Sequence, residues 1–164
     1  MLMLVHRMGS LDYRALMQIY EDSNRDNGKE FYPQEPAARQ LELAEQDFYS
    51  YLIQTFFRTP GAFYALWQPD GVPVSALRLE PYKDGLLLSA LETAPNCRRR
   101  GYAQALIRAV LDQIDCKRIY SHVGKRNRAS LTVHEHCGFR RVSECALYLD
   151  GSANDRCCTL LLER

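Results

Sequence analysis

The sequence lacks a long apolar run and an excess of charge of either sign. Its 164 residues carry 21 Lys and Arg against 20 Asp and Glu, which leaves a formal net charge of +1. A chain so close to neutral has no overall field that attracts nucleic acid or an anionic membrane, so neither is an expected partner. The apolar N-terminal residues 1–5 stop too early for a secretory signal or a membrane-spanning helix. We therefore expect a cytoplasmic protein.

The sequence also lacks the cysteine spacing of a disulfide framework or a zinc site. The six cysteines contain no CxxC pair, and several lie in apolar segments, where cysteine behaves as a small hydrophobic residue. They are Cys97, Cys116, Cys137, Cys145, Cys157 and Cys158. Reduced thiols are therefore expected. His134 and His136 precede Cys137, but histidines two residues apart on a helix point to different faces, so no metal site is predicted.

No internal repeat, linker or low-complexity tract divides the chain, and its length fits a single domain over residues 1–164. Apolar periodicity and turn residues predict the following order: strand 2–5, helix 11–22, loop 24–36, helix 38–58, strands 62–67, 73–80 and 86–93, helix 101–114, strand 117–123, helix 127–136, and strands 139–149 and 156–162. Ser10 is placed to cap the first helix. The pattern predicts an α/β fold with a mixed, mostly antiparallel central sheet of about six to seven strands flanked by four helices.

A basic turn, Arg98-Arg99-Arg100, joins a strand that ends at Thr93 to a helix that begins at Gly101. The first turn of a helix leaves backbone N–H groups unpaired and carries a partial positive charge, so such a junction can bind phosphate. Gly101 would let a pyrophosphate approach the backbone, and the small Ala103 keeps the next turn clear. Arginines at a helix N-terminus are unfavourable without an anion, although a solvated basic turn is the alternative interpretation.

The pattern Arg-x-x-Gly-x-Ala over residues 98–103 closely resembles the acetyl-CoA signature of the GCN5-related N-acetyltransferase (GNAT) family. The segment from Asn127 to the pair Gly138-Phe139 is similar to a later helix of the same family. The resemblance implies an acyl-CoA N-acyltransferase fold. It also implies transfer of an acetyl group from acetyl-CoA to a primary amine of a small molecule, peptide or protein, by direct attack in a ternary complex and without a metal.

The resemblance also implies which residues hold acetyl-CoA. Backbone amides of the turn would bind the pyrophosphate, and these belong to Arg98, Arg99, Arg100, Gly101, Tyr102 and Ala103. The strand end from Leu91 to Thr93 would pair with the pantetheine arm. Asn127 would contact the cofactor or hold the site open beside it, and a simple helix N-cap is the other interpretation.

Two residues are candidates for proton transfer. Glu92, at the polar end of the central strand, could deprotonate the attacking amine, or it could form a structural ion pair with Arg98. Many relatives have a tyrosine proton donor four residues before the glycine of the Gly-Phe pair, and His134 occupies that position here. Alternative donors are Tyr120, His122 and Tyr148. A backbone amide near Thr93 would polarise the thioester carbonyl.

The predicted loop 24–36 is the candidate for acceptor recognition. It carries Phe31 and Tyr32 among acidic residues and follows Tyr20, a mixture that could bind a cationic amine, although an ordinary solvated loop has the same composition. A rival hypothesis is a CoA-binding sensor or interaction module without turnover, because His134 replaces the usual tyrosine. Exposed strands at the C-terminus leave room for a homodimer.

Overall fold

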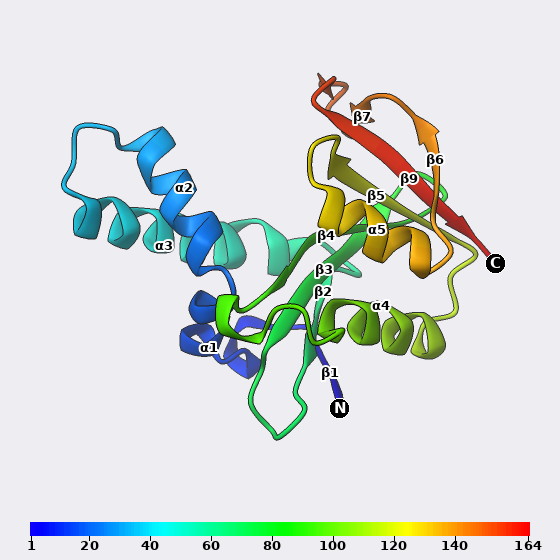
Figure 1. Cartoon of the computed structure of the whole chain (residues 1–164), viewed down its shortest axis with the longest axis horizontal. Coiled ribbons are helices and arrows are strands. Elements are labelled where there is room, and N and C mark those ends of the chain that lie inside the picture. Colours follow the sequence, from blue (N-terminus) through cyan, green and yellow to red (C-terminus); the bar gives the residue numbers. More distant parts are fainter.

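The computed structural model describes residues 1–164 and contains a seven-stranded sheet with helices on both faces (Figure 1). The sheet strands are β1 (Leu2–Val5), β2 (Phe63–Trp67), β3 (Ser75–Tyr82), β4 (Gly85–Thr93), β5 (Arg118–Gly124), β6 (Arg140–Ser143) and β9 (Cys157–Glu163). They lie in the order β1-β2-β3-β4-β5-β9-β6, and only β4 and β5 run parallel. A separate hairpin consists of β7 (Ala146–Leu147) and β8 (Ala153–Asn154).

The helices are α1 (Tyr13–Ile19), α2 (Glu21–Phe31), α3 (Ala37–Gln54), α4 (Tyr102–Gln113) and α5 (Arg128–His136). Short 3-10 turns occur at Met8–Ser10, Phe56–Arg58 and Pro95–Cys97. None of the helices combines the length and the apolar character needed to cross a membrane.

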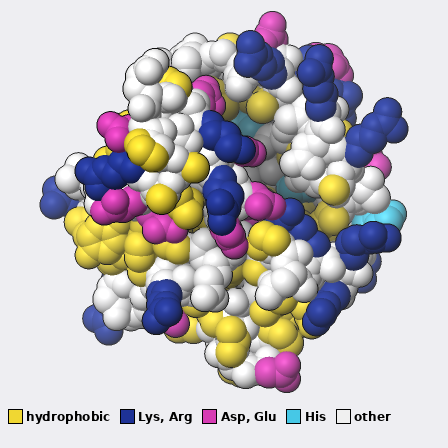
Figure 2. All heavy atoms as spheres, turned by 60° about the vertical axis from the view of Figure 1, so that its left-hand side comes forward, with side chains coloured by type: hydrophobic (Ala, Val, Ile, Leu, Met, Phe, Trp, Pro, Cys, Tyr) yellow, Lys and Arg dark blue, Asp and Glu magenta, His cyan; other side chains and the backbone are white.

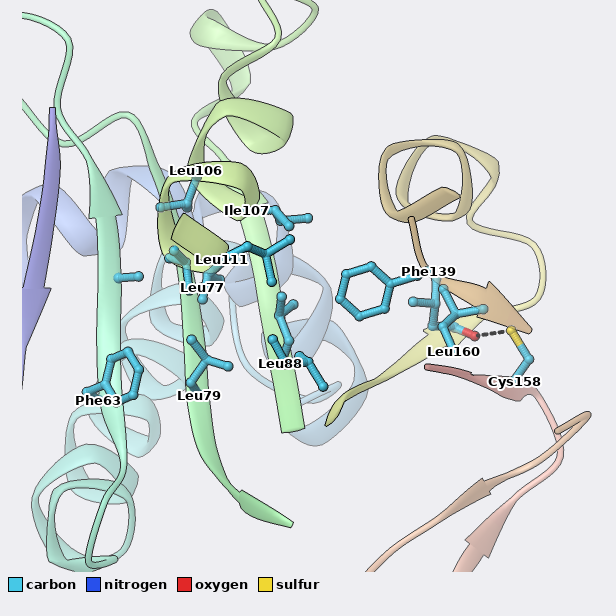
Figure 3. Close-up of a cluster of buried hydrophobic side chains, with 14 residues drawn as sticks. Phe63, Leu77, Leu79, Leu88, Leu106, Ile107, Leu111, Phe139, Cys158 and Leu160 are labelled. Atoms are coloured by element: carbon cyan, nitrogen blue, oxygen red, sulfur yellow. Dashed lines mark hydrogen bonds between the residues drawn. The ribbon is translucent and has the colours of Figure 1, made fainter. Parts of the chain in front are cut away.

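Alternating side chains of the strands build a separate apolar cluster on each face of the sheet. In β3, Leu77 and Leu79 pack under α4, whereas Ala76 packs under α1 and α3. Figure 3 shows the first cluster, in which Leu106 of α4 and Phe139, which follows α5, come down onto the strands. Helices α4 and α5 therefore cover one face, and α1 to α3 cover the other.

The predicted architecture is confirmed, including the antiparallel meander of β2, β3 and β4. The loop predicted over 24–36 is wrong, because most of this segment belongs to the helix α2. The fold therefore has five helices instead of the four predicted. A Cβ at Gly28 would lie 2.6 Å from the carbonyl oxygen of Gln40, so glycine at this position lets α2 pack closely against α3. Tertiary packing has overridden the low helix propensity of the Asn27-Gly28 pair.

Two smaller expectations at the chain ends are also wrong. Asp12 caps α1 by accepting a hydrogen bond from the backbone N–H of Ala15 at 3.0 Å, whereas Ser10 lies in the preceding 3-10 turn. The strand predicted over 139–149 is divided into β6 and β7. The register of β6 against β9 shifts after Arg141, and the chain then leaves the sheet to form the β7–β8 hairpin.

Strands β4 and β5 are joined at one end and separate at the other. They pair only at Leu86–Leu88 with Ile119–Ser121, although β4 continues to Thr93. Gly85 lets the two strands approach closely at the paired end, since a Cβ there would lie 2.0 Å from the carbonyl oxygen of Arg118. The register of β4 against β3 shifts near Ala90, which has a φ of 50°, so β4 bends where the pairing with β5 stops. The last part of β4 therefore has a free edge toward β5.

Candidate functional site

The turn before α4 presents a run of unpaired backbone N–H groups. Arg99 and Gly101 have positive φ values of 63° and 77°, and Gly101 is the N-cap of α4 without any side-chain capping bond. No N–H group from Arg98 to Gln104 donates a hydrogen bond within the protein, and the first bond of the helix runs from Ala105 to Gly101 at 2.9 Å. Successive amides in such a turn, together with the helix dipole, form an anion-binding site. We call residues 98–104 the amide cradle.

Arg98 anchors the cradle to the rest of the protein. Its guanidinium lies 2.7 Å from the carboxylate of Asp22 on α2, and its Nε donates to the carbonyl oxygen of Thr93 at 3.1 Å. Arg98 therefore fixes the end of β4 to α2. The ion pair between Arg98 and Glu92 that the sequence suggested is replaced by this pair with Asp22.

Glu92 lies on the last part of β4, on the face toward α2. Its carboxylate accepts a hydrogen bond from the hydroxyl of Ser23. Burial raises the pKa of Glu92 above its usual value, while the bond from Ser23 and the nearby Arg98 oppose this rise. The hydroxyl of Ser75 donates to the backbone carbonyl oxygen of Glu92 at 2.7 Å, so the main chain is held from the β3 side. A partly buried carboxylate with a raised pKa is suited to accept a proton.

His134 is buried in the core, with 1% of its surface exposed. Its Nδ1 lies 2.8 Å from the carbonyl oxygen of Ser130, so this nitrogen carries the proton, and its Nε2 accepts from the hydroxyl of Ser121 at 3.0 Å. Burial lowers the pKa of His134, which keeps the ring neutral. Both ring nitrogens thus have partners inside the protein, and the role of His134 as proton donor stays a prediction.

The buried His134 predicts a loss of stability in acid. Its pKa is lowered from 6.5 in the fold, so below pH 6.5 the unfolded chain binds more protons than the folded one. The free energy of unfolding should therefore fall as the pH drops from 6.5 through the folded pKa. His134→Gln should lower Tm at pH 7, because the hydrogen bonds of the ring with Ser121 and Ser130 are lost. It should also flatten the dependence of Tm on pH between 7 and 5, because the group that titrates is removed.

The matched control for this prediction is His136→Gln, because His136 is exposed on the same helix. It should keep both the Tm and the pH dependence of the original protein. An equal slope of Tm against pH in His134→Gln and the original protein would contradict the assignment.

Residues 14–139 match the Acetyltransferase (GNAT) family. The chain belongs to this family. A comparison with curated proteins by sequence found no match. This match confirms the prediction that the chain is a GNAT protein.

Solved structures of GNAT proteins share the fold. The PaiA N-acetyltransferase of Thermoplasma acidophilum, solved with coenzyme A, aligns with a TM-score of 0.66 at 12% identity and covers 100% of this chain and 99% of its own. The ribosomal-protein-S18-alanine N-acetyltransferase of Escherichia coli aligns at 0.63 and 16%, covering 99% and 94%. An acetyltransferase of Thermus thermophilus aligns at 0.68 and 18%, covering 99% and 97%.

The other residues predicted for the cofactor lie on β4, in the first turn of α4 and at the start of α5. Leu91 packs against the apolar cluster under α4, and its backbone belongs to the unpaired part of β4. Tyr102 and Ala103 form the first turn of α4. Asn127 caps α5 by accepting from the N–H of Ser130 at 3.1 Å, so the helix-cap interpretation applies to its side chain.

The structure separates the three aromatic residues predicted for the acceptor in this GNAT protein. Tyr20 is buried and donates to the carbonyl oxygen of Ala90, at the bend of β4, at 2.6 Å. Phe31 is 66% exposed at the far end of α2, and Tyr32 donates to Asp47. The helix α2 places Phe31 roughly 16 Å from Tyr20 along its axis. Only Tyr20 lies beside the strand that carries Glu92.

The alternative proton donors lie on the other half of the same sheet face. Tyr120 donates to Asp84 at 2.7 Å, and the ring of His122 packs between Tyr82 and Tyr148. Figure 2 shows the surface hollowed near the centre of the view, with charged side chains of both signs along the edge of the hollow. No group of three or more His, Cys, Asp or Glu side chains is arranged to bind a metal ion.

Three polar residues on this face were missed in the sequence: Tyr64, Arg78 and Ser89. Each comes from a different strand, and each has a buried polar atom without a hydrogen-bond partner. The available signal was an arginine at a position of β3 that alternates with the core residues Leu77 and Leu79.

Proposed function

We propose that this GNAT protein transfers an acetyl group from acetyl-CoA to a primary amine of a small molecule, peptide or protein. The observation that carries the proposal is the unpaired amide cradle, which lies next to a strand with a free edge. The space around Gly101 also fits a phosphate ligand, because a Cβ there would meet no atom within 4 Å. Coenzyme A is present in the structure of the Thermoplasma acidophilum relative, which supports the same cofactor class here.

The cradle and β4 would hold acetyl-CoA in two ways. Backbone N–H groups from Arg98 to Gln104 would bind the pyrophosphate, since these donors have no partner within the protein. The unpaired edge of Leu91–Thr93 would pair with the amides of the pantetheine arm, as a strand edge pairs with an extended peptide. This arrangement would bring the thioester to the part of β4 that carries Glu92.

In the proposed reaction Glu92 takes the proton from the ammonium group of the acceptor, directly or through a water molecule. The free amine then forms a bond to the carbonyl carbon, the bond from that carbon to sulfur breaks, and the nitrogen releases its second proton to water as the neutral amide forms. A backbone N–H near Thr93 would polarise the carbonyl. Tyr20 holds the bend of β4 through Ala90, so these groups start in fixed positions.

The departing thiolate also needs a proton. The neutral ring of His134 has one N–H group, at Nδ1, which donates to the carbonyl oxygen of Ser130, so transfer of this proton to the thiolate would break an internal hydrogen bond. A thiol with a pKa near ~8.5 takes a proton from water at neutral pH, so the proposed reaction proceeds without a dedicated acid.

A thiol-trapping assay tests the proposal. The protein is incubated with acetyl-CoA and a panel of primary amines, and we expect release of CoA that depends on the amine, with the acetylated product detected by mass spectrometry. Saturable binding of acetyl-CoA without acetylation of any amine would instead support a CoA-binding module. That second function is favoured by the internal hydrogen bonds of His134, which stands at the usual tyrosine position.

A further inference from the structure

Four polar side chains lie side by side across the sheet. Tyr64 on β2 pairs with Arg78 on β3, and Arg78 pairs with Ser89 on β4. The parallel pairing of β4 and β5 ends one residue earlier, at Leu88 and Ser121, so His122 is the next residue beside Ser89. We call these four residues the cross-strand row.

All four side chains point to the face that carries α1 and α3. Tyr64 belongs to the apolar cluster of that face, and the guanidinium of Arg78 stacks over Tyr51 and Phe56 at 5.0 and 5.7 Å from the ring centroids. Their neighbours along the strands, such as Leu88, point into the opposite cluster. With paired strands about 4.8 Å apart, Tyr64, Arg78 and Ser89 span roughly 10 Å, and His122 lies beyond them where β4 and β5 separate.

The cross-strand row contains every buried side-chain nitrogen or oxygen of the protein that has no hydrogen-bond partner. These atoms are Tyr64 Oη, Arg78 Nε, Ser89 Oγ, His122 Nδ1 and His122 Nε2. Buried polar atoms in folded proteins almost always have partners in the protein or in ordered water, so five such atoms in one row indicate a polar layer whose hydrogen bonds are completed by groups outside the chain.

The charge in the row is the unpaired guanidinium of Arg78. No carboxylate lies within ion-pair distance of it, in contrast to Arg98 and Arg118, which both pair with carboxylates. Glu80 shares the strand and the face of Arg78 but forms no ion pair with it. A guanidinium cannot lose its proton, and its planar fork matches a carboxylate with two parallel hydrogen bonds. The hydroxyl of Ser89 would add a donor.

The row lies beside the proposed catalytic carboxylate. Ala76 pairs with Glu92, and Arg78 is two residues further along β3 on the same face, a separation of about 7 Å. Glu92 would bind the amine of the acceptor, and Arg78 would bind an anionic group on the same molecule. We propose that the acyl acceptor is an amine that also carries a carboxylate, and that the cross-strand row binds this carboxylate. The inference rests on the acetyl transfer proposed above.

Matched pairs of acceptors test the inference. Each pair consists of an amino acid and the same compound with its carboxylate converted to a carboxamide. The original protein should show a kcat/KM at least ~10-fold higher for the carboxylate, the range expected for charge-assisted hydrogen bonds. Arg78→Met should raise KM for the carboxylate ~10- to 100-fold and leave KM for the carboxamide almost unchanged. Arg78→Lys should have a KM for the carboxylate between those of the original protein and Arg78→Met.

Controls separate recognition from folding. Arg58→Met removes an exposed arginine near the same face and should leave kcat/KM for both acceptors unchanged. Ser89→Ala is a smaller change in the row. It should raise KM for the carboxylate acceptor several-fold, and it can be measured even if Arg78→Met does not fold. Tm and acetyl-CoA affinity should be the same in Ser89→Ala as in the original protein.

Failure of the inference is distinct from failure of the proposed function. Equal kcat/KM for carboxylates and carboxamides would overturn the inference and leave acetyl transfer intact. If no amine is acetylated, the proposed function fails, and the row is then tested by calorimetry with N-acetyl amino acids in the presence of CoA. Binding that Arg78→Met abolishes would support the row, and equal binding of the N-acetyl amino acid amides would overturn it.

Discussion

Replacing Gly101 with glutamate is expected to raise the Kd for acetyl-CoA at least ~100-fold, because it places a negative charge among the amides that would bind the pyrophosphate. Gly101 is the N-cap of α4, and the N–H groups on both sides of it have no partner within the protein. A new carboxylate there would accept these hydrogen bonds itself. Isothermal calorimetry with acetyl-CoA measures the loss.

The fold should survive this substitution. A side chain at Gly101 meets no atom within 4 Å, and a carboxylate at a helix N-terminus is favourable for the helix dipole. The positive φ of 77° adds strain, so Gly101→Asn is the matched control, because asparagine tolerates this conformation and carries no charge. Asparagine should keep most of the affinity. Unchanged binding in Gly101→Glu would overturn the placement of the cofactor.

Replacing Glu92 with glutamine is expected to lower kcat/KM for the amine by about 10²- to 10⁴-fold, the usual contribution of a general base. The affinity for acetyl-CoA should remain, because the cofactor would contact the backbone of β4 rather than this side chain. A protonated carboxyl cannot act as a base, so activity in the original protein should fall as the pH drops through the pKa of Glu92. Burial raises that pKa, and Glu92→Gln should remove this acidic limb of the pH profile.

Two further variants sharpen the assignment of Glu92. Ser23→Ala removes a hydrogen bond that lowers the pKa of Glu92, so the acidic limb should move to higher pH. Glu45→Gln is the control, because burial also raises the pKa of Glu45, which lies on α3. It should change neither the rate nor the pH profile. An unchanged kcat/KM in Glu92→Gln would contradict the role of Glu92 as the general base.

Local sequence carried the most information where function depends on neighbouring residues. The amide cradle is a contiguous turn, and its chemistry follows from Gly101, the basic residues before it and the helix after it. The order of the strands could be predicted for the same reason, since apolar alternation is a local pattern. The helix α2 was missed because it packs closely against α3, where Gly28 lies against Gln40, and no local pattern contains that contact.

The surroundings of the candidate catalytic residues depended on distant contacts. Arg98 lay close enough to Glu92 in the sequence to suggest an ion pair, but α2 brings Asp22 to the arginine and Ser23 to the glutamate. His134 matched the position of a proton donor, yet Ser121 on β5 occupies its second nitrogen. Such partners are decided by the packing of elements and not by the motif.

The sequence by itself determined the GNAT family, most of the order of the elements and the amide cradle, because each is expressed in periodicity or in contiguous residues. Only the tertiary structure decided that β4 and β5 separate beyond Leu88 and that Tyr64, Arg78, Ser89 and His122 form one row. Each of these four residues comes from a different strand. Strand register alone brings them together, and register is set by long-range pairing across the sheet.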